Sequence, residues 1–247
     1  MSPENGLTSS TFPAAQIAEF LAALGWDPQS ESSDEVGTEE SEQTTPFLSV
    51  VMRTRGTRAL GLAEALNSLG EQEDMDFEVV LVAHEVDSAG ETLITETLAV
   101  VPEAVRSRLR RIDGTRDGRA APLNDGFAAA CGRYIAVLDD DDIVYPNWVA
   151  AFRQGADDAP GQVIRTVAQS QVFRFCTSDG AEAAEPVGDL QTWPDHFNIA
   201  EHLYANYTPF LSVAIPREVF HLAGLRFDES LSTAEDWEFL IRVALLA

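Results

Sequence analysis

Residues 139–142 are four consecutive aspartates that directly follow the apolar run Tyr-Ile-Ala-Val-Leu. Adjacent carboxylates repel one another, and a divalent cation bound among them relieves the repulsion. Because side chains alternate along an extended segment, we expect Asp139 and Asp141 to point to one side and to share an ion with a ligand's phosphate oxygens. A solvated acidic turn is the alternative, but the position at the end of an apolar strand favours a metal site.

A second acidic motif, Glu235-Asp236-Trp237, opens the last amphipathic stretch of the chain. Acidic residues in the first turn of a helix are stabilised by the helix dipole, which is a purely structural explanation. The functional hypothesis is that one of the two carboxylates, Asp236 or Glu235, acts as a general base. The tripeptide alone does not decide between these explanations.

The elements that must position these motifs follow a regular order in the first half of the domain. Apolar runs with the composition of buried strands alternate with helical patterns, which predicts an α/β fold with a mostly parallel, Rossmann-like sheet. In such sheets ligands bind beyond the carboxyl ends of the strands, so we expect the segments after the strands to form one site. The predicted strands are 46–54, 77–83 and 133–138, and the predicted helices are 58–69, 91–109 and 123–132.

The second half of the domain has a less regular pattern. Residues 163–175 are predicted to form a pair of extended strands, and residues 177–200, which include Pro186 and Pro194, a loop. A strand followed by a helix is predicted at 208–220, and a terminal amphipathic helix from residue 234.

The first 45 residues differ in composition from the rest, with nine acidic side chains and no basic one. A short helical pattern at 13–24 is followed by a polar, acidic stretch without aromatic residues, which is typical of a disordered linker. We therefore divide the chain into an acidic leader, residues 1–45, and one α/β domain, residues 46–247.

The 247-residue chain carries 41 acidic and 16 basic side chains, all of the latter Arg, for a formal charge of −25. This excess of negative charge argues against binding to nucleic acid or to an anionic membrane surface. An anionic substrate then requires either a local cluster of Arg side chains or a bound cation.

Cysteine content and hydropathy bear on the location of the protein. Cys131 and Cys176 do not make a disulfide framework, and their apolar sequence neighbours predict buried thiols. No apolar run approaches the length of a membrane-spanning helix, and the N-terminus lacks the pattern of a signal peptide. We therefore expect a cytoplasmic protein without a membrane span.

Taken together and in order, the motifs resemble those of the family 2 glycosyltransferases, which have the GT-A fold. The resemblance covers residues 46–247 and depends on the pairing of the aspartate run with the distant Glu-Asp-Trp. It is carried by the segments PFLSVVMRTRGTR, LAEALNSLGEQ, DFEVVLVA, LNDGFAAACGRYIAVLDDDD and VFHLAGLRFDESLSTAEDWEFLIRVA.

The resemblance implies roles for the acidic residues. Asp139 and Asp141 match the Asp-x-Asp motif with which the family holds Mn²⁺ or Mg²⁺ against the diphosphate of a nucleotide-sugar donor. Asp236, with Glu235 beside it, matches the catalytic base of the inverting members, which takes a proton from the attacking hydroxyl of the acceptor.

The resemblance also implies which residues contact the donor. The loop after the first strand lines the nucleotide pocket in the family, and for Arg119 a role in surface charge balance is an equally good explanation. The residues matched to donor binding are Thr54, Arg55, Arg58, Arg119, Asn124 and Asp140.

Two departures from the family pattern keep alternatives open. Ala83 and His84 stand where the family often has paired aspartates that contact the base, so the donor base is not assigned. The chain ends at Ala247, soon after Asp236, whereas many relatives continue, so an inactive GT-A-like nucleotide-binding or scaffold module is the main alternative. A nucleotidyltransferase is disfavoured, because the loop after the first strand has only Gly56 and is not glycine-rich.

The sequence leaves the second substrate open. The acceptor is a carbohydrate, a lipid-linked molecule or a protein, and the oligomeric state is not assigned.

Overall fold

A computed structural model describes residues 10–11, 15–27, 45–178 and 181–246. Apart from Thr45, the linker predicted between the leader helix and the domain lies outside these residues. In the described part of the chain, no helix is long and apolar enough to cross a membrane.

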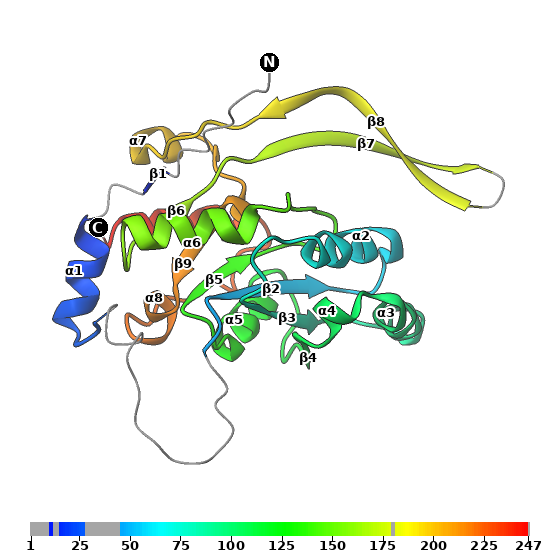
Figure 1. Cartoon of the computed structure of the whole chain (residues 1–247), viewed down its shortest axis with the longest axis horizontal. Helices are drawn as coiled ribbons and strands as arrows, with labels where there is room; N and C mark the ends of the chain where they lie inside the picture. The colour runs from blue at the N-terminus through cyan, green and yellow to red at the C-terminus, as the bar shows by residue number, and fades with distance from the viewer. Residues whose placement is uncertain (1–9, 12–14, 28–44, 179–180, 247) are drawn as a thin grey trace, which may run out of the picture.

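The centre of the molecule is a seven-stranded sheet with helices on both of its faces (Figure 1). The strands β5, β2, β3 and β4 are neighbours and run parallel, whereas β9 pairs antiparallel with both β5 and β6, and β1 pairs antiparallel with β6. In spatial order the strands are β1 (Ser10–Thr11), β6 (Ile164–Arg165), β9 (Val213–Pro216), β5 (Tyr134–Val137), β2 (Leu48–Thr54), β3 (Phe77–Ala83) and β4 (Leu109–Asp113).

The helices divide between the two faces of the sheet according to the hydrophobic cluster that they join. One cluster includes side chains of α2 (Ala59–Gly70), α3 (Ser88–Val100), α4 (Glu103–Arg106) and α6 (Trp148–Asp158). The other includes side chains of α1 (Ala15–Ala23), α5 (Ala120–Ala129), α8 (Arg217–His221) and α9 (Glu235–Ala244). Two short elements, α7 (Ile199–His202) and the 3₁₀-helix η2 (Phe210–Ser212), precede β9 in the chain.

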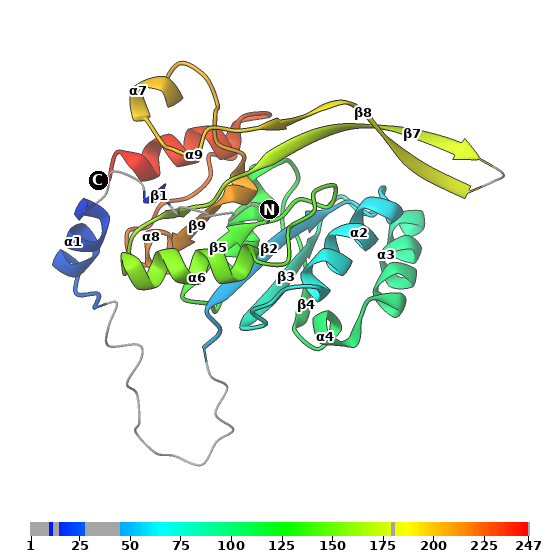
Figure 2. The same cartoon turned by 45° about the horizontal axis from the view of Figure 1, so that its top comes forward.

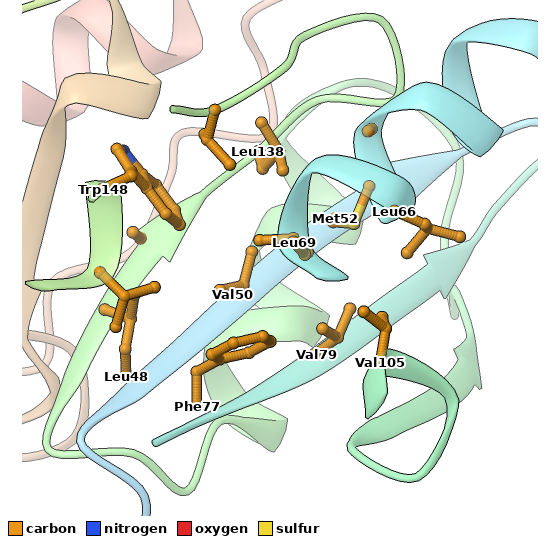
Figure 3. Close-up of a cluster of buried hydrophobic side chains, with 14 of the residues drawn as sticks. Leu48, Val50, Met52, Leu66, Leu69, Phe77, Val79, Val105, Leu138 and Trp148 are labelled. Carbon is orange, nitrogen blue, oxygen red and sulfur yellow. The ribbon is translucent and has the colours of Figure 1, made fainter. Parts of the chain in front are cut away.

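The central strands contribute side chains to both hydrophobic clusters. In β2, Val50 and Met52 pack in one cluster while Val51 packs in the other, because successive side chains of a strand point to opposite faces. Figure 3 shows Val50 and Met52 beside Leu66 and Leu69 of α2. The strand is therefore apolar on both faces, which explains the continuous apolar run in its sequence.

Much of the predicted secondary structure of the first half is confirmed. The strands predicted at 46–54, 77–83 and 133–138 correspond to β2, β3 and β5. The helix predicted over 91–109 is interrupted before Pro102, which has no N–H to continue the hydrogen bonding of α3. The strand β4, which is half-exposed and contains Arg110 and Arg111, was not predicted from the sequence.

The prediction of a loop at 177–200 is wrong over most of its length. The strand β7 (Gln169–Ser178) pairs antiparallel with β8 (Ala181–Thr192), and the two form a ribbon that extends away from the body of the molecule (Figures 1 and 2). The predicted pair of strands at 163–175 is also corrected, because β6 joins the main sheet and β7 pairs with β8. The ribbon strands pair through backbone hydrogen bonds, and none of their described side chains (169–174 and 185–192) is buried, so apolar alternation does not mark these residues.

The helix predicted in the leader is present as α1, and it packs on the domain. Ile17 and Leu21 are fully buried in the cluster that also contains Val219 and Phe239. The side chain of Cys131 is exposed, which corrects the prediction of a buried thiol at that position. The side chain of Cys176 lies outside the described part of the structure.

Candidate active site

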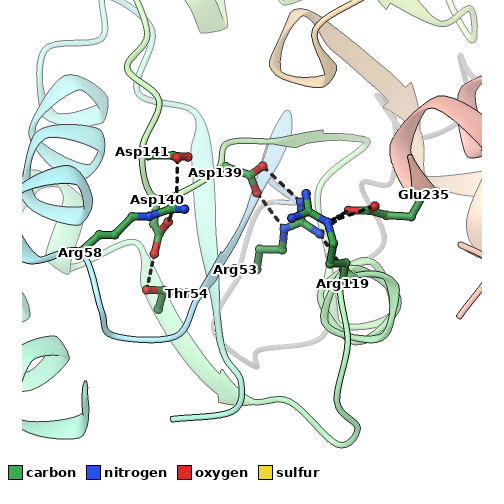
Figure 4. Close-up of polar contacts among 8 residues, drawn as sticks. All are labelled: Arg53, Thr54, Arg58, Arg119, Asp139, Asp140, Asp141 and Glu235. Carbon is green, nitrogen blue, oxygen red and sulfur yellow. Dashed lines mark hydrogen bonds and ion pairs between the residues drawn. The ribbon is translucent and has the colours of Figure 1, made fainter. Parts of the chain in front are cut away.

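The aspartate run follows β5, next to the carboxyl end of β2 in the sheet. Because β2 and β5 are adjacent and parallel, their ends bring Arg53 and Asp139 together across 86 residues of sequence. The first turn of α9 reaches the same place and contributes Glu235 (Figure 4). The two acidic motifs of the sequence therefore meet at one edge of the sheet.

Arg53 joins the two motifs. Its Nε and Nη2 atoms donate to Asp139 Oδ1 and Oδ2 at 2.9 and 3.2 Å, and its Nη1 donates to Glu235 Oε1 at 2.7 Å. Burial disfavours the charge of the guanidinium, but the ion pairs with Asp139 and Glu235 outweigh it and raise the pKa of Arg53 above its usual value. This guanidinium thus supplies a permanent positive charge among the carboxylates.

Glu235 is fully buried and held by two arginines. Besides Arg53, Arg119 Nε donates to Glu235 Oε1 at 2.9 Å. Burial opposes the ionisation of Glu235, but hydrogen bonds and ion pairs, chiefly from Arg53, lower its pKa. A carboxylate with these partners is suited to anchoring the start of α9, and it does not line the cavity described below.

The next two aspartates form a second cluster around Arg58. Arg58 Nη1 lies 3.0 Å from Asp140 Oδ1 and 2.6 Å from Asp141 Oδ2. Thr54 Oγ1 donates to Asp140 Oδ2 at 2.6 Å, and Asp140 is buried. The Arg58–Asp141 pair is different, because both side chains are about half exposed.

Residues of both acidic motifs line the same cavity, which has a volume of about 260 Å³. Asp139 and Asp142 line it from the end of β5, and Asp236 lines it from α9. The base of the β7–β8 ribbon, including Gln169 and Trp193, forms another wall. Asp236 and Asp139 therefore line the same cavity although they come from distant parts of the chain.

The cavity affects the protonation of its acidic residues. Burial raises the pKa of Asp236, although the backbone N–H of Trp237, which donates to Asp236 Oδ1 at 2.8 Å, opposes the shift. Burial, followed by the negative charges of Asp139 and Asp141, raises the pKa of Asp142 to about 7. A carboxylate with a raised pKa is a stronger base than an exposed one, which is the property that a general base needs.

Some predicted donor residues have other partners in the structure. Asn124 is buried and hydrogen bonds to the backbone of Phe227 and to the side chain of Glu229, in the segment that leads to α9. Arg55 Nε pairs with Glu85 Oε2 at 3.1 Å. Arg119 is half exposed beside Glu235, and Thr54 and Arg58 both hydrogen bond to Asp140.

No individual role was predicted from the sequence for Arg53 or Asp142. A signal for Arg53 was present, because a basic residue near the end of an otherwise buried strand requires an acidic partner. Gln169, Ser170 and Trp193, at the base of the ribbon, also line the cavity. No sequence pattern indicated this role, because it depends on where the hairpin leaves the domain.

The residues present fit a divalent cation whose remaining ligands come from a substrate. In the described part of the chain, no group of three or more His, Cys, Asp or Glu side chains is arranged to hold an ion by itself. Mg²⁺ is commonly held by one or two carboxylates together with substrate phosphates, and carboxylate oxygens suit Mn²⁺ as well. Of the two predicted metal ligands, Asp139 lines the cavity with Asp142 as a neighbouring carboxylate, whereas Asp141 pairs with Arg58 and is not among the residues that line the cavity.

Solved structures with low sequence identity share this fold. TarS of S. aureus, in a complex with UDP-GlcNAc, matches 81% of this chain and 53% of its own chain, with a TM-score of 0.55 and 18% identity. The mannosyltransferase PcManGT of Pyrobaculum calidifontis, in a complex with GDP-Man and Mn²⁺, matches 93% of this chain and 61% of its own, with a TM-score of 0.53 and 17% identity. These similarities confirm the predicted GT-A fold.

Sequence comparisons show the family. The succinoglycan biosynthesis protein ExoO of Rhizobium meliloti (strain 1021) is 29% identical over 185 residues, which cover 72% of this chain. The chain spans half the length of that relative. Residues 49–175, more than half of the chain, match the family described as Glycosyl transferase family 2, and the protein is therefore a member of that family.

Proposed function

We propose that this domain transfers a sugar from a nucleotide-sugar donor to an acceptor hydroxyl, with inversion at the anomeric carbon and with the help of a divalent cation. The observation that carries this proposal is the cavity shared by Asp139 and Asp236. One carboxylate is suited to a cation that binds diphosphate, the other to a hydroxyl that must lose a proton. The acceptor class and the cytoplasmic location stay predictions from the sequence.

Asp139 and Asp141 would hold Mn²⁺ or Mg²⁺ together with oxygens of the donor diphosphate. The ion, when bound, stabilises the negative charge that develops on the departing nucleoside diphosphate. The Arg58–Asp141 pair is exposed, and such pairs contribute only about 0–1 kcal/mol, so it separates at little cost. Its separation frees a carboxylate for the cation and a guanidinium for the diphosphate.

Asp236 acts as the general base in this proposal. It accepts the proton of the acceptor hydroxyl while that oxygen attacks the anomeric carbon from the face opposite the diphosphate. Arg53 and Glu235 position Asp236 through the first turn of α9, and Arg53 also orients Asp139. Thr54, Arg55, Arg119 and Asp140 complete the donor side of the site.

The direct test is turnover of nucleotide-sugars in the presence of Mn²⁺, measured as released nucleoside diphosphate. We expect Asp236→Asn to lower turnover by about 10²–10⁴-fold, the usual contribution of a general base, and to leave the affinity for the nucleoside diphosphate unchanged. Glu238→Gln is the matched control, because Glu238 lies in the same helical turn and pairs with Arg242. Full activity of Asp236→Asn would show that the base has been assigned wrongly.

One observation favours a second candidate, a GT-A-like module that binds nucleotides without turnover. Both carboxylate oxygens of Asp139 accept hydrogen bonds from Arg53, so a cation at Asp139 competes with this guanidinium. Calorimetry with UDP and GDP in the presence of Mn²⁺ separates the two candidates. Binding without turnover of any nucleotide-sugar would support the module and contradict the transferase.

A further inference from the structure

A second hollow lies beside α7, close to the cavity that contains Asp236. It has a volume of about 500 Å³ and is lined by Pro194, Ala200, Glu201, Tyr204 and Tyr207. Tyr204 is 85% exposed and Tyr207 is 37% exposed, so both rings are accessible to a ligand.

The hollow and the cavity are lined by consecutive residues of the same two segments. Trp193 lines the cavity and Pro194, the next residue, lines the hollow; Asn206 and Tyr207 repeat the same arrangement. The short helix α7 is also tied to α9, because Trp237 Nε1 donates to the carbonyl oxygen of His202 at 2.7 Å. Figure 2 shows α7 and α9 on the same side of the molecule. The hollow therefore lies beside an element that is hydrogen-bonded to the helix of the proposed base, Asp236.

The walls of the hollow are held by a buried arginine. Arg165 is 1% exposed, and its guanidinium donates to the backbone carbonyl oxygens of Pro194, His196 and Tyr207, the last at 3.1 Å. These hydrogen bonds connect the two segments that carry the lining residues. The hollow therefore has a defined shape before a ligand binds, which lowers the entropy cost of binding.

The lining residues suit a saccharide that carries no charge. The rings of Tyr204, Tyr207 and Pro194 offer flat apolar surfaces on which the C–H faces of sugar rings can stack, and the tyrosine hydroxyls can donate or accept hydrogen bonds. Glu201 can accept hydrogen bonds from sugar hydroxyls, but it repels carboxylated or phosphorylated ligands. The carboxylates of the neighbouring cavity strengthen this repulsion.

We propose that this hollow, here called the tyrosine hollow and defined by Pro194, Ala200, Glu201, Tyr204 and Tyr207, binds a neutral saccharide as the acceptor. The inference rests on the proposed transferase function and names the class of its second substrate. Tyr204 and Tyr207 hold the sugar chain, and its terminal hydroxyl reaches the adjoining cavity toward Asp236. The chemistry of the hollow disfavours uronic acid chains and sugar phosphates.

Saccharide binding can be measured without turnover. We would titrate the protein, without donor or metal, with cellotetraose, laminaritetraose and maltotetraose, and with tetragalacturonate as an anionic chain of the same length, using saturation-transfer NMR. We expect at least one neutral tetrasaccharide to bind and tetragalacturonate not to bind. The double variant Tyr204→Ala/Tyr207→Ala should weaken binding by about tenfold, the scale expected for the loss of stacked aromatic contacts.

Phe20→Ala is the matched control, because Phe20 is a similarly exposed aromatic residue on α1, and it should leave saccharide binding unchanged. The inference is overturned if no neutral tetrasaccharide binds, if tetragalacturonate binds equally well, or if the tyrosine variant binds as well as the wild-type protein. Because the titration needs neither donor nor metal, its result is independent of diphosphate release. Release of diphosphate without saccharide binding would reject the tyrosine hollow and leave the transferase proposal standing.

Discussion

Arg53 and Glu235 lie 182 positions apart in the sequence and form a buried ion pair, with 2.7 Å between Arg53 Nη1 and Glu235 Oε1. The pair connects β2 to the first turn of α9, and Arg53 simultaneously binds Asp139 after β5. Since Glu235 immediately precedes Asp236, the ion pair determines where Asp236 enters the cavity. Positioning of the proposed base therefore depends on a residue that takes no part in the proposed chemistry.

The first prediction concerns the pH dependence of stability. Glu235 has a lowered pKa in the folded protein, because Arg53 and Arg119 outweigh the effect of burial. Its stabilising contribution is therefore fully present above its ordinary pKa of 4.5 and is lost as the pH falls through the lower folded value. Glu235→Gln should be less stable than wild type at pH 7, by up to about 3 kcal/mol, and should lose less stability on acidification.

Urea denaturation at pH 7 and at pH 3.5 measures this difference. Glu238→Gln is the control, because its pair with Arg242 is an i,i+4 pair at the surface and contributes about 0.3–0.5 kcal/mol. An equal loss of stability on acidification in wild type and Glu235→Gln would show that Glu235 is not the group responsible.

The second prediction separates two roles for Asn124. Its side chain donates to the carbonyl oxygen of Phe227 and to Glu229, at 3.0 and 2.9 Å, and accepts from the N–H of Phe227 at 2.8 Å. Asn124→Ala leaves both backbone groups of Phe227 without these partners and should cost about 1–3 kcal/mol of stability. The affinity for UDP or GDP, measured by calorimetry, should not change. A large loss of nucleotide affinity with unchanged stability would instead support the donor-binding role predicted from the sequence.

The third prediction concerns the second metal ligand. We expect Asp141→Asn to raise the Mn²⁺ concentration needed for nucleotide binding by at least about tenfold. Substitution of a residue that merely contacts a metal ligand already lowers metal affinity by about 10–100-fold, so loss of a ligand should cost at least as much. Asp142→Asn is the matched comparison, since Asp142 lines the cavity with Asp139 but has no arginine partner among the hydrogen bonds and ion pairs described. A larger effect of Asp142→Asn than of Asp141→Asn would transfer the ligand assignment to Asp142.

The fourth prediction concerns backbone strain beside the proposed base. Ala234 precedes α9 with φ 60° and ψ 24°, in the left-handed region that residues other than glycine rarely adopt. Ala234→Gly should therefore raise the free energy of unfolding by about 1 kcal/mol. Ala151→Gly, within α6, is the control and should lower it by about 1 kcal/mol. A decrease in the melting temperature of Ala234→Gly would contradict the assignment of strain.

Local patterns were sufficient for the elements whose burial shows in consecutive residues. The continuous apolar runs of β2, β3 and β5 predicted strands covered on both faces, and their order predicted a sheet whose carboxyl ends carry the site. The position of Asp139 at such an end follows from the same reasoning. The strands β4 and β8 do not have such continuous apolar runs, and their sequences therefore did not indicate strands.

The sequence by itself therefore determined the fold class, the family resemblance and the edge of the sheet at which the acidic motifs gather. The tertiary structure decided which side chains meet: Arg53 with Glu235, Arg58 with Asp141, and Asn124 with the segment after α8. A periodic pattern records whether a residue faces the core, because that property is local. The partner of a buried charge depends on how distant elements pack, and the energy of the pair depends on the burial and geometry that this packing creates.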